Sequence, residues 1–174
     1  MKFGFDEIPC KEYIPVIRKY IEILKEKLGD NLVSVVLFGS VARGDAKRES
    51  DIDLLIVAEK WPKDFGERIK ILIEIYKILE EQEEYRKAVK NGFHVSVSEY
   101  PLSVREAFKH GPLDLEILAD GIILYDKNGF MKRKLEDLRL KLEKIGARRE
   151  YDEENKRWYW VLRKNVCFGE VVEI

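Results

Sequence analysis

The chain has 174 residues, of which 45% are hydrophobic, so it is long enough for one packed domain, too short for two large ones, and unlike a disordered segment. Its 32 basic and 33 acidic residues, set against a single glutamine, are typical of proteins from hot environments, and their formal net charge of −1 gives no reason to expect a membrane or nucleic-acid partner. The first residues lack the pattern of a signal peptide, no apolar stretch reaches transmembrane length, and the two cysteines lie far apart in the sequence, which together predict a cytoplasmic protein.

The first third of the chain predicts a helix followed by two strands. Residues 12–28 carry an apolar stripe at helical spacing and end at Gly29, which indicates an amphipathic helix. Residues 32–38 and 51–58 are rich in β-branched and other apolar side chains, which favours two strands buried on both faces. Between these strands, residues 39–50 are rich in glycine, serine and charge and are expected to form a loop.

The middle of the chain predicts a long helix, a third strand and two short helices. Apolar residues recur at helical spacing over 64–89, although the last part of this segment is fully charged. Apolar and polar residues alternate over 93–98, which predicts a strand with one polar face. Two short helices are expected over 103–109 and 113–119.

The last third predicts a strand, a helix and a small β appendage. Residues 122–125 indicate a short strand, and a helix is expected after Asn128 and Gly129. Residues 147–151 and 157–163 resemble a hairpin with an acidic turn, and a final short strand is expected near 170–174. The pattern as a whole predicts an α/β (α+β) fold with a mixed sheet flanked by helices and a small C-terminal β-hairpin.

Two acidic residues open the second predicted strand. Asp51 and Asp53 are two positions apart, so their side chains share one face, while Ile52 and Leu54 point into the core. Neighbouring carboxylates repel each other, and burial raises the cost of their charge. A pair of magnesium ions would remove that cost and prefers oxygen ligands. The alternative is a pair of exposed acids that cap a turn.

The loop before these acids has the features of a phosphate site. Gly39 directly follows the first strand, where backbone can approach a ligand closely. Ser40 adds a hydroxyl and, with the next amides, a predicted helix N-terminus that attracts phosphate. Arg43 can contact phosphate oxygens, or else form a surface salt bridge. The loop and the acids meet only if the two strands are antiparallel neighbours.

The spacing of these residues resembles a known signature. Gly39-Ser40, ten further residues and then Asp51-Ile52-Asp53 resemble the motif of the DNA polymerase β-like nucleotidyltransferase superfamily, and the string GSVARGDAKRESDIDLLIV is similar to its minimal, antitoxin-type branch. The resemblance implies that Gly39 and Ser40 hold the phosphates of ATP or another nucleoside triphosphate, and that Asp51 and Asp53 bind two Mg²⁺ ions. It further implies a nucleotidyltransferase domain over 1–126, with a helix and hairpin over 127–174 packed on it.

The sequence departs from this family at one position. The family has a third carboxylate on the next core strand, whereas the polar face here carries His94, Ser96 and Ser98, and Glu99 comes one residue late. Three interpretations stay open. Glu99 reaches the site through a bulge or from the end of the strand, His94 acts as the catalytic base, or the protein binds nucleotide with weak or no transfer.

The resemblance implies transfer of a nucleoside monophosphate, AMP from ATP in the first instance, to an acceptor hydroxyl. The acceptor would be a side chain of a helical, toxin-like partner protein, a small molecule or an RNA end. A rival from another class is a nucleotide-binding antitoxin that acts by contact alone. A further alternative function is RNA binding through the aromatic run Trp158-Tyr159-Trp160. Packing of this run on the last helix, or a homodimer contact, explains it more simply.

Overall fold

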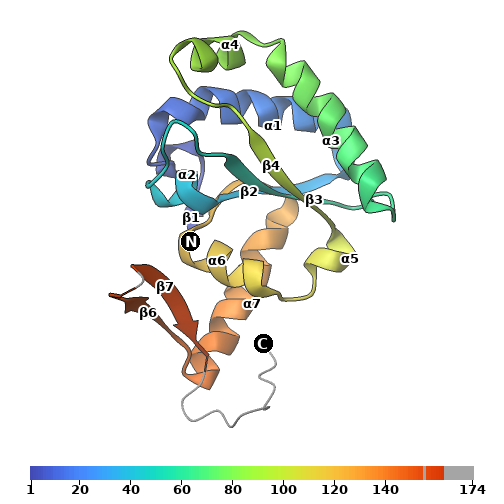
Figure 1. The fold of residues 1–174 in the computed structure, drawn as a ribbon. Coiled ribbons are helices and arrows are strands. Elements are labelled where there is room, and N and C mark those ends of the chain that lie inside the picture. Colours follow the sequence, from blue (N-terminus) through green and yellow to red (C-terminus); the bar gives the residue numbers. More distant parts are fainter. Residues whose placement is uncertain (155, 163–174) are drawn as a thin grey trace.

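A computed structural model describes residues 1–154 and 156–162 of the chain. Five strands form a sheet in the order β1-β5-β2-β3-β4 (Figure 1). β2 is antiparallel to both of its neighbours, whereas β1 pairs with β5, and β3 with β4, in parallel. A separate hairpin follows near the C-terminus. The strands are β1 (Lys2–Phe3), β2 (Leu32–Phe38), β3 (Ile52–Ala58), β4 (Val97–Ser103), β5 (Ile122–Asp126), β6 (Arg148–Asp152) and β7 (Arg157–Val161).

Helices cover both faces of the sheet, with α1, α3 and α4 on one side and α5, α6 and α7 on the other (Figure 1). None of the helices in the described part of the chain is long and apolar enough to cross a membrane. The α-helices are α1 (Ile14–Leu28), α2 (Gly39–Arg43), α3 (Phe65–Glu80), α4 (Glu83–Lys90), α5 (Val104–Ala107), α6 (Pro112–Asp120) and α7 (Phe130–Ile145). Short 3-10 helices are η1 (Phe5–Glu7), η2 (Lys11–Tyr13), η3 (Gly29–Asn31) and η4 (Lys127–Gly129).

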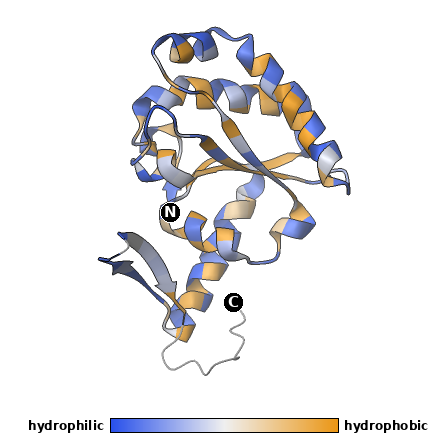
Figure 2. Cartoon of the chain, in the orientation of Figure 1, coloured by the Kyte–Doolittle hydropathy of each residue, from blue (hydrophilic) through white to orange (hydrophobic). Residues whose placement is uncertain are grey.

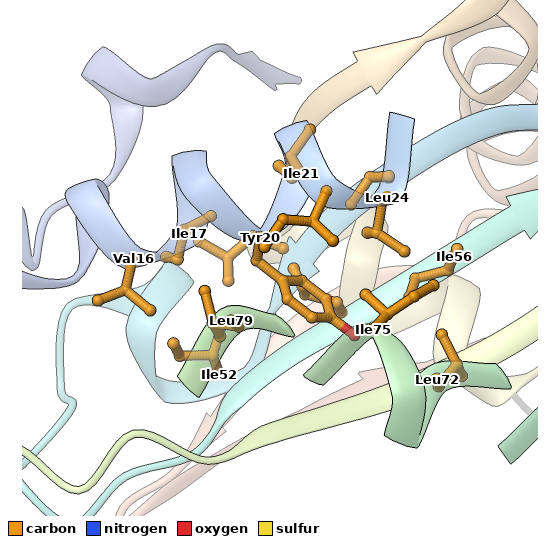
Figure 3. Packing of buried hydrophobic residues seen from close by; sticks show 14 of the residues in the cluster. Val16, Ile17, Tyr20, Ile21, Leu24, Ile52, Ile56, Leu72, Ile75 and Leu79 are labelled. Carbon is orange, nitrogen blue, oxygen red and sulfur yellow. The ribbon is translucent and has the colours of Figure 1, made fainter. Parts of the chain in front are cut away.

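The core consists of two layers separated by the sheet. Because side chains alternate along a strand, Leu54 and Ile56 of β3 face α1 and α3, whereas Leu55 and Val57 face α5, α6 and α7. Figure 3 shows Tyr20 of α1 among the aliphatic side chains of α3 and the sheet. The central strands are coloured mostly hydrophobic in Figure 2, as expected for strands buried on both faces.

The predicted fold class, a mixed α/β sheet with a C-terminal hairpin, is confirmed. The bounds of two predicted elements are wrong. The helix expected over 64–89 is two helices, α3 and α4, which meet at Glu81 and Gln82. The third strand begins at Val97 rather than at residue 93 and continues through Pro101, which an edge strand tolerates because its outer side needs no N–H donor. The strand expected near 170–174 lies outside the described residues.

A buried arginine ties α3 to β4 and α5. Arg68 is only 6% exposed, and its guanidinium donates to the carbonyl oxygens of Pro62 and Pro101 at 2.6 and 3.1 Å. It also donates to both carboxylate oxygens of Glu106, at 2.8 and 2.9 Å. This hydrogen-bonded arginine lowers the pKa of Glu106 from 4.5 to about 2. The ion pair therefore contributes stability above about pH 4.5 that is lost as the pH falls towards about 2.

We expect Glu106→Gln to lower the free energy of unfolding at pH 7 by about 1–2 kcal/mol, because the buried guanidinium loses a charged acceptor. Urea denaturation monitored between pH 7 and pH 3 measures this difference, which should narrow as the pH falls. Glu83→Gln is the matched control, because Glu83 forms an exposed i,i+4 pair with Lys87. Equal losses in the two variants would contradict the structural role of Arg68.

Candidate functional site

The predicted phosphate loop and the two acids meet at one end of the sheet. β2 and β3 are antiparallel neighbours, and Phe38, the last residue of β2, pairs with Asp53. The chain turns directly from Phe38 into α2, whose first residues therefore lie beside the start of β3. A cavity of about 450 Å³ opens there. It is lined by Phe38, Gly39, Ser40, Arg43, Glu49, Ser50, Asp51, Asp53 and Glu116.

Gly39 is required by the position of a carboxylate. Its φ angle is +69°, a left-handed conformation that residues with a side chain rarely adopt. A Cβ atom at this position would lie 2.0 Å from Oδ2 of Asp53. Gly39 and Ser40 also begin α2, and the first amides of a helix have no hydrogen-bond partner within it. The turn therefore presents backbone donors directly beside an acidic oxygen.

The two aspartates differ in exposure. Asp51 is exposed and lies one residue before β3, whereas Asp53 is half-buried within it, on the sheet face that carries Leu55 and Val57. Burial, with smaller contributions from the negative charges of Asp51 and Glu116, raises the pKa of Asp53. Without a cation the site therefore concentrates negative charge at a partly desolvated position.

The loop that carries Asp51 is held at several points. The buried Tyr13 donates its hydroxyl to the carbonyl oxygen of Lys47 at 2.6 Å. The hydroxyl of Ser50 accepts a hydrogen bond from the amide of Lys47 at 2.9 Å. The amide of His94 donates to the carbonyl oxygen of Arg48 at 2.7 Å. These contacts fix the approach of the chain to Asp51.

Arg43 lies in the cavity between acids. Its guanidinium contacts Oδ2 of Asp45 at 3.3 Å and Oε1 of Glu116 at 3.1 Å. Glu116 is an exposed residue of α6, and α6 packs against α2. The sequence pattern indicates neither Glu116 nor Glu49 as a residue of this cavity, although both line it. Nothing local marks Glu116, because its place depends on how α6 packs some seventy residues after Arg43.

The residue of β4 that pairs with Asp53 is a serine, not an acid. β3 and β4 pair in parallel with a regular register that sets Asp53 beside Ser98 and Leu54 beside Glu99. The Ser98 hydroxyl contacts Asp53 and moderates the rise of its pKa. No bulge interrupts this pairing, so Glu99 does not reach the site, and the interpretation that it does so through a bulge is wrong.

Glu99 instead points to the opposite face of the sheet, below α1. Its Oε1 accepts a hydrogen bond of 2.6 Å from the hydroxyl of Tyr20, which is 1% exposed. Burial raises the pKa of Glu99, and the Tyr20 hydrogen bond partly offsets that rise. A buried tyrosine hydroxyl needs an acceptor, so Glu99 has a structural partner where it lies.

His94 is likewise not among the residues that line the cavity. It is exposed and precedes β4 by three residues. The geometry brings together Gly39, Ser40, Arg43, Asp51 and Asp53, and leaves out His94 and Glu99. Their individual roles stay predictions.

The donor set fits magnesium bound together with a phosphate ligand. Within residues 1–154 and 156–162, no group of three or more His, Cys, Asp or Glu side chains is arranged to hold a metal ion. Magnesium commonly takes only one or two carboxylates from a protein, and water and substrate phosphates supply its remaining oxygens. Asp51 and Asp53 provide such a pair, beside a backbone cradle that a Cβ would fill.

Comparison with known proteins defines the class. The profile of the nucleotidyltransferase domain family matches residues 17–114, more than half of the chain. The chain therefore belongs to this family and is a nucleotidyltransferase. It is 34% identical over 143 residues to "Putative protein adenylyltransferase MJ1305" of Methanocaldococcus jannaschii, an alignment that covers 82% of this chain and 90% of that protein. It is 37% identical over 98 residues to "Putative protein adenylyltransferase MJ0141" of the same organism, covering 53% and 99%.

Among solved structures, the chain resembles a variant of the toxin–antitoxin pair MntA-HpeT. The TM-score is 0.48, the sequences are 17% identical, and the match covers 74% of this chain and 91% of that chain.

We expect Gly39→Ala to weaken binding of Mg-ATP by at least about tenfold, which is about 1.4 kcal/mol. The new methyl group would displace the Asp53 carboxylate and strain the backbone. Isothermal titration calorimetry measures the affinity, and thermal denaturation verifies that the variant folds. Gly111→Ala is the control, because a Cβ there meets nothing within 4 Å. Equal affinity in both variants would contradict this account of the turn.

Proposed function

We propose that this nucleotidyltransferase moves AMP from ATP to a hydroxyl group of a partner protein, with magnesium at Asp51 and Asp53. The observation that carries the proposal is the close approach of the Asp53 carboxylate to the backbone of Gly39, which joins a cation site to a phosphate site. The names of the two M. jannaschii relatives support adenylyl transfer to protein. The resemblance of the motif to antitoxin-type enzymes supports a helical, toxin-like partner.

Gly39, Ser40, Arg43 and the two aspartates have distinct parts in this proposal. Gly39 and Ser40 bind the β- and γ-phosphates through backbone amides and a hydroxyl. Arg43 exchanges a carboxylate for a phosphate oxygen and so neutralises the departing pyrophosphate. Magnesium, when bound, supplies positive charge that balances the aspartates and the triphosphate.

No carboxylate of β4 is placed to take the proton of the acceptor hydroxyl, because the residue that pairs with Asp53 is Ser98, whereas the family has a carboxylate on this strand. The carboxylates that line the cavity are those of Glu49, Asp51, Asp53 and Glu116. We therefore propose slow transfer. Ser98 also favours a second candidate, a nucleotide-binding antitoxin that neutralises its partner by contact with little or no catalysis.

We propose further that residues 1–126 form the nucleotidyltransferase domain and that 127–174 extend it. Met131 and Leu135 of α7 belong to the same apolar cluster as Val36 of β2, so the described part of the extension shares a core with the domain. A homodimer and binding of nucleic acid stay predictions.

Labelled ATP separates the two candidate functions. We expect transfer of labelled AMP to a co-purified or genetically adjacent partner protein, and we expect Asp53→Asn to reduce it by at least about a thousandfold, because a direct contact to the reacting phosphate site is lost. Glu99→Gln is the matched control and should retain transfer, since the Tyr20 hydroxyl can donate to the amide oxygen. Mg-ATP binding without any transfer by the wild-type protein would favour the contact-only antitoxin. Equal losses in both variants would contradict the placement of Glu99 outside the site.

Ser98→Asp tests the missing third acid. A carboxylate beside Asp53 would supply a base and a further cation ligand, so we expect the rate of transfer to rise by about ten- to hundredfold. The melting temperature without magnesium should fall because the acids repel, and magnesium should restore it. Ser96→Asp is the control, because Ser96 lines a different cavity beside Tyr76 and Glu99. An unchanged rate in Ser98→Asp would show that catalysis is limited elsewhere.

A further inference from the structure

A second and larger cavity adjoins the acidic one. Its volume is about 830 Å³, and it lies between α6 and the β6–β7 hairpin. Arg43 and Glu116 line both cavities, so the two adjoin at this ion pair. The remaining lining residues are Asp45, Pro112, Leu115, Ala119, Asp120, Arg149, Tyr151, Lys156, Trp158 and Trp160. A volume of this size is typical of small-molecule sites.

One wall of this cavity is aromatic. Trp158 of β7 is 55% exposed and lines the cavity, although tryptophan is usually well buried. Its ring lies 5.1 Å from that of Tyr151 across the hairpin, and the guanidinium of Arg149 lies 5.0 Å from its centroid. Opposite this wall, Pro112, Leu115 and Ala119 form an apolar strip along α6, at spacings that share one side of a helix.

The aromatic wall is fixed against α6. Arg149 of β6 donates two hydrogen bonds to the carboxylate of Asp120, the last residue of α6, at 3.1 and 2.6 Å. A bidentate pair of this kind sets orientation as well as distance. Because the guanidinium of the same arginine lies 5.0 Å from the centroid of the Trp158 ring, the ion pair positions the ring relative to α6. The cavity is therefore built by specific contacts.

We propose that this cavity binds the nucleobase and ribose of the nucleotide whose phosphates occupy the acidic cavity. This inference rests on the proposed function, since it assumes that a triphosphate binds beside Gly39. A planar base would stack on the exposed Trp158 ring, as bases do on aromatic side chains in many nucleotide-binding proteins. The shared pair of Arg43 and Glu116 marks the passage from phosphates to nucleoside.

The opposite side of the acidic cavity suits the acceptor better. Glu49 and Asp51 line that side and are exposed. A hydroxyl on another protein has to approach from open solvent, whereas a nucleoside fits between two walls. The geometry thus assigns the nucleotide to the Arg43 side and the partner to the Asp51 side.

Tryptophan fluorescence tests this assignment in the full chain. The protein has three tryptophans, of which Trp61 is 9% exposed in the core, whereas Trp158 and Trp160 line the cavity, so the two hairpin rings should dominate a ligand-dependent change. We expect Mg-ATP to quench the emission. Magnesium tripolyphosphate, which lacks a base, should bind in competition with ATP without quenching.

Variants separate the base site from the phosphate site. Trp158→Ala should raise the dissociation constant for Mg-ATP by at least about tenfold and leave that for tripolyphosphate unchanged. Trp158→Phe should retain most of the ATP affinity, and melting curves verify that both variants fold. Phe65→Ala is the matched control, because Phe65 is 59% exposed and lines neither cavity.

Three results would overturn the inference, and they differ in meaning. Unchanged ATP affinity in Trp158→Ala, or ATP binding that leaves the emission unchanged, would exclude the base site while the phosphate site stands. If Trp158→Ala loses transfer to a partner protein but keeps its ATP affinity, the cavity binds the acceptor instead of the base. Failure of the wild-type protein to bind either ATP or tripolyphosphate with magnesium would refute the proposed function as well.

Discussion

The close approach between the Asp53 carboxylate and the Gly39 backbone is the constraint on which the site depends. A side chain at position 39 would overlap Oδ2 of Asp53, so the turn after β2 can only be glycine if the acid keeps its place. The same contact brings backbone donors beside a carboxylate whose pKa burial has raised. Such an arrangement has excess negative charge on one side and, on the other, donors without a partner inside their helix. A magnesium-bound phosphate would complement both sides at once.

The topology of the sheet determines which residues can join this contact. An antiparallel β2–β3 pair places the turn and the acids at the same end, and a parallel β3–β4 pair brings the start of β4 to that end as well. On the face of β4 that points to the site, the residue at this end is Ser98. Glu99 points to the opposite face, where it accepts a hydrogen bond from the Tyr20 hydroxyl. A displacement of β4 by one residue would bring Glu99 to the acids. It would also move all remaining side chains of the strand to the opposite face of the sheet. The core therefore opposes such a change.

Much of this arrangement could be predicted from the sequence because it is local. Gly39, Ser40, Asp51 and Asp53 lie within fifteen residues, and two buried strands flank their loop, so antiparallel pairing of these strands is enough to bring them together. The start of β4 was harder to predict. Residues 93–96 alternate between apolar and polar as a strand does, but the amide of His94 bonds to the carbonyl oxygen of Arg48 in the loop before β3. Residues 64–89 were predicted as one helix because the spacing of apolar residues does not show that the chain changes direction between α3 and α4. Glu116 and the aromatic cavity depend on packing between distant segments, which no local pattern records.

The charges around Arg43 suggest how the empty and nucleotide-bound forms can both be stable. In this structure Arg43 bridges Asp45 and Glu116, and so balances part of the negative charge near Asp53. A triphosphate would offer the same guanidinium more highly charged oxygens, and magnesium would take over the balancing of the aspartates. Glu116 would then be released at the boundary between the two cavities, where it can accept hydrogen bonds from ribose hydroxyls. A single arginine would thus couple occupation of the proposed phosphate site to the chemistry of the adjoining cavity.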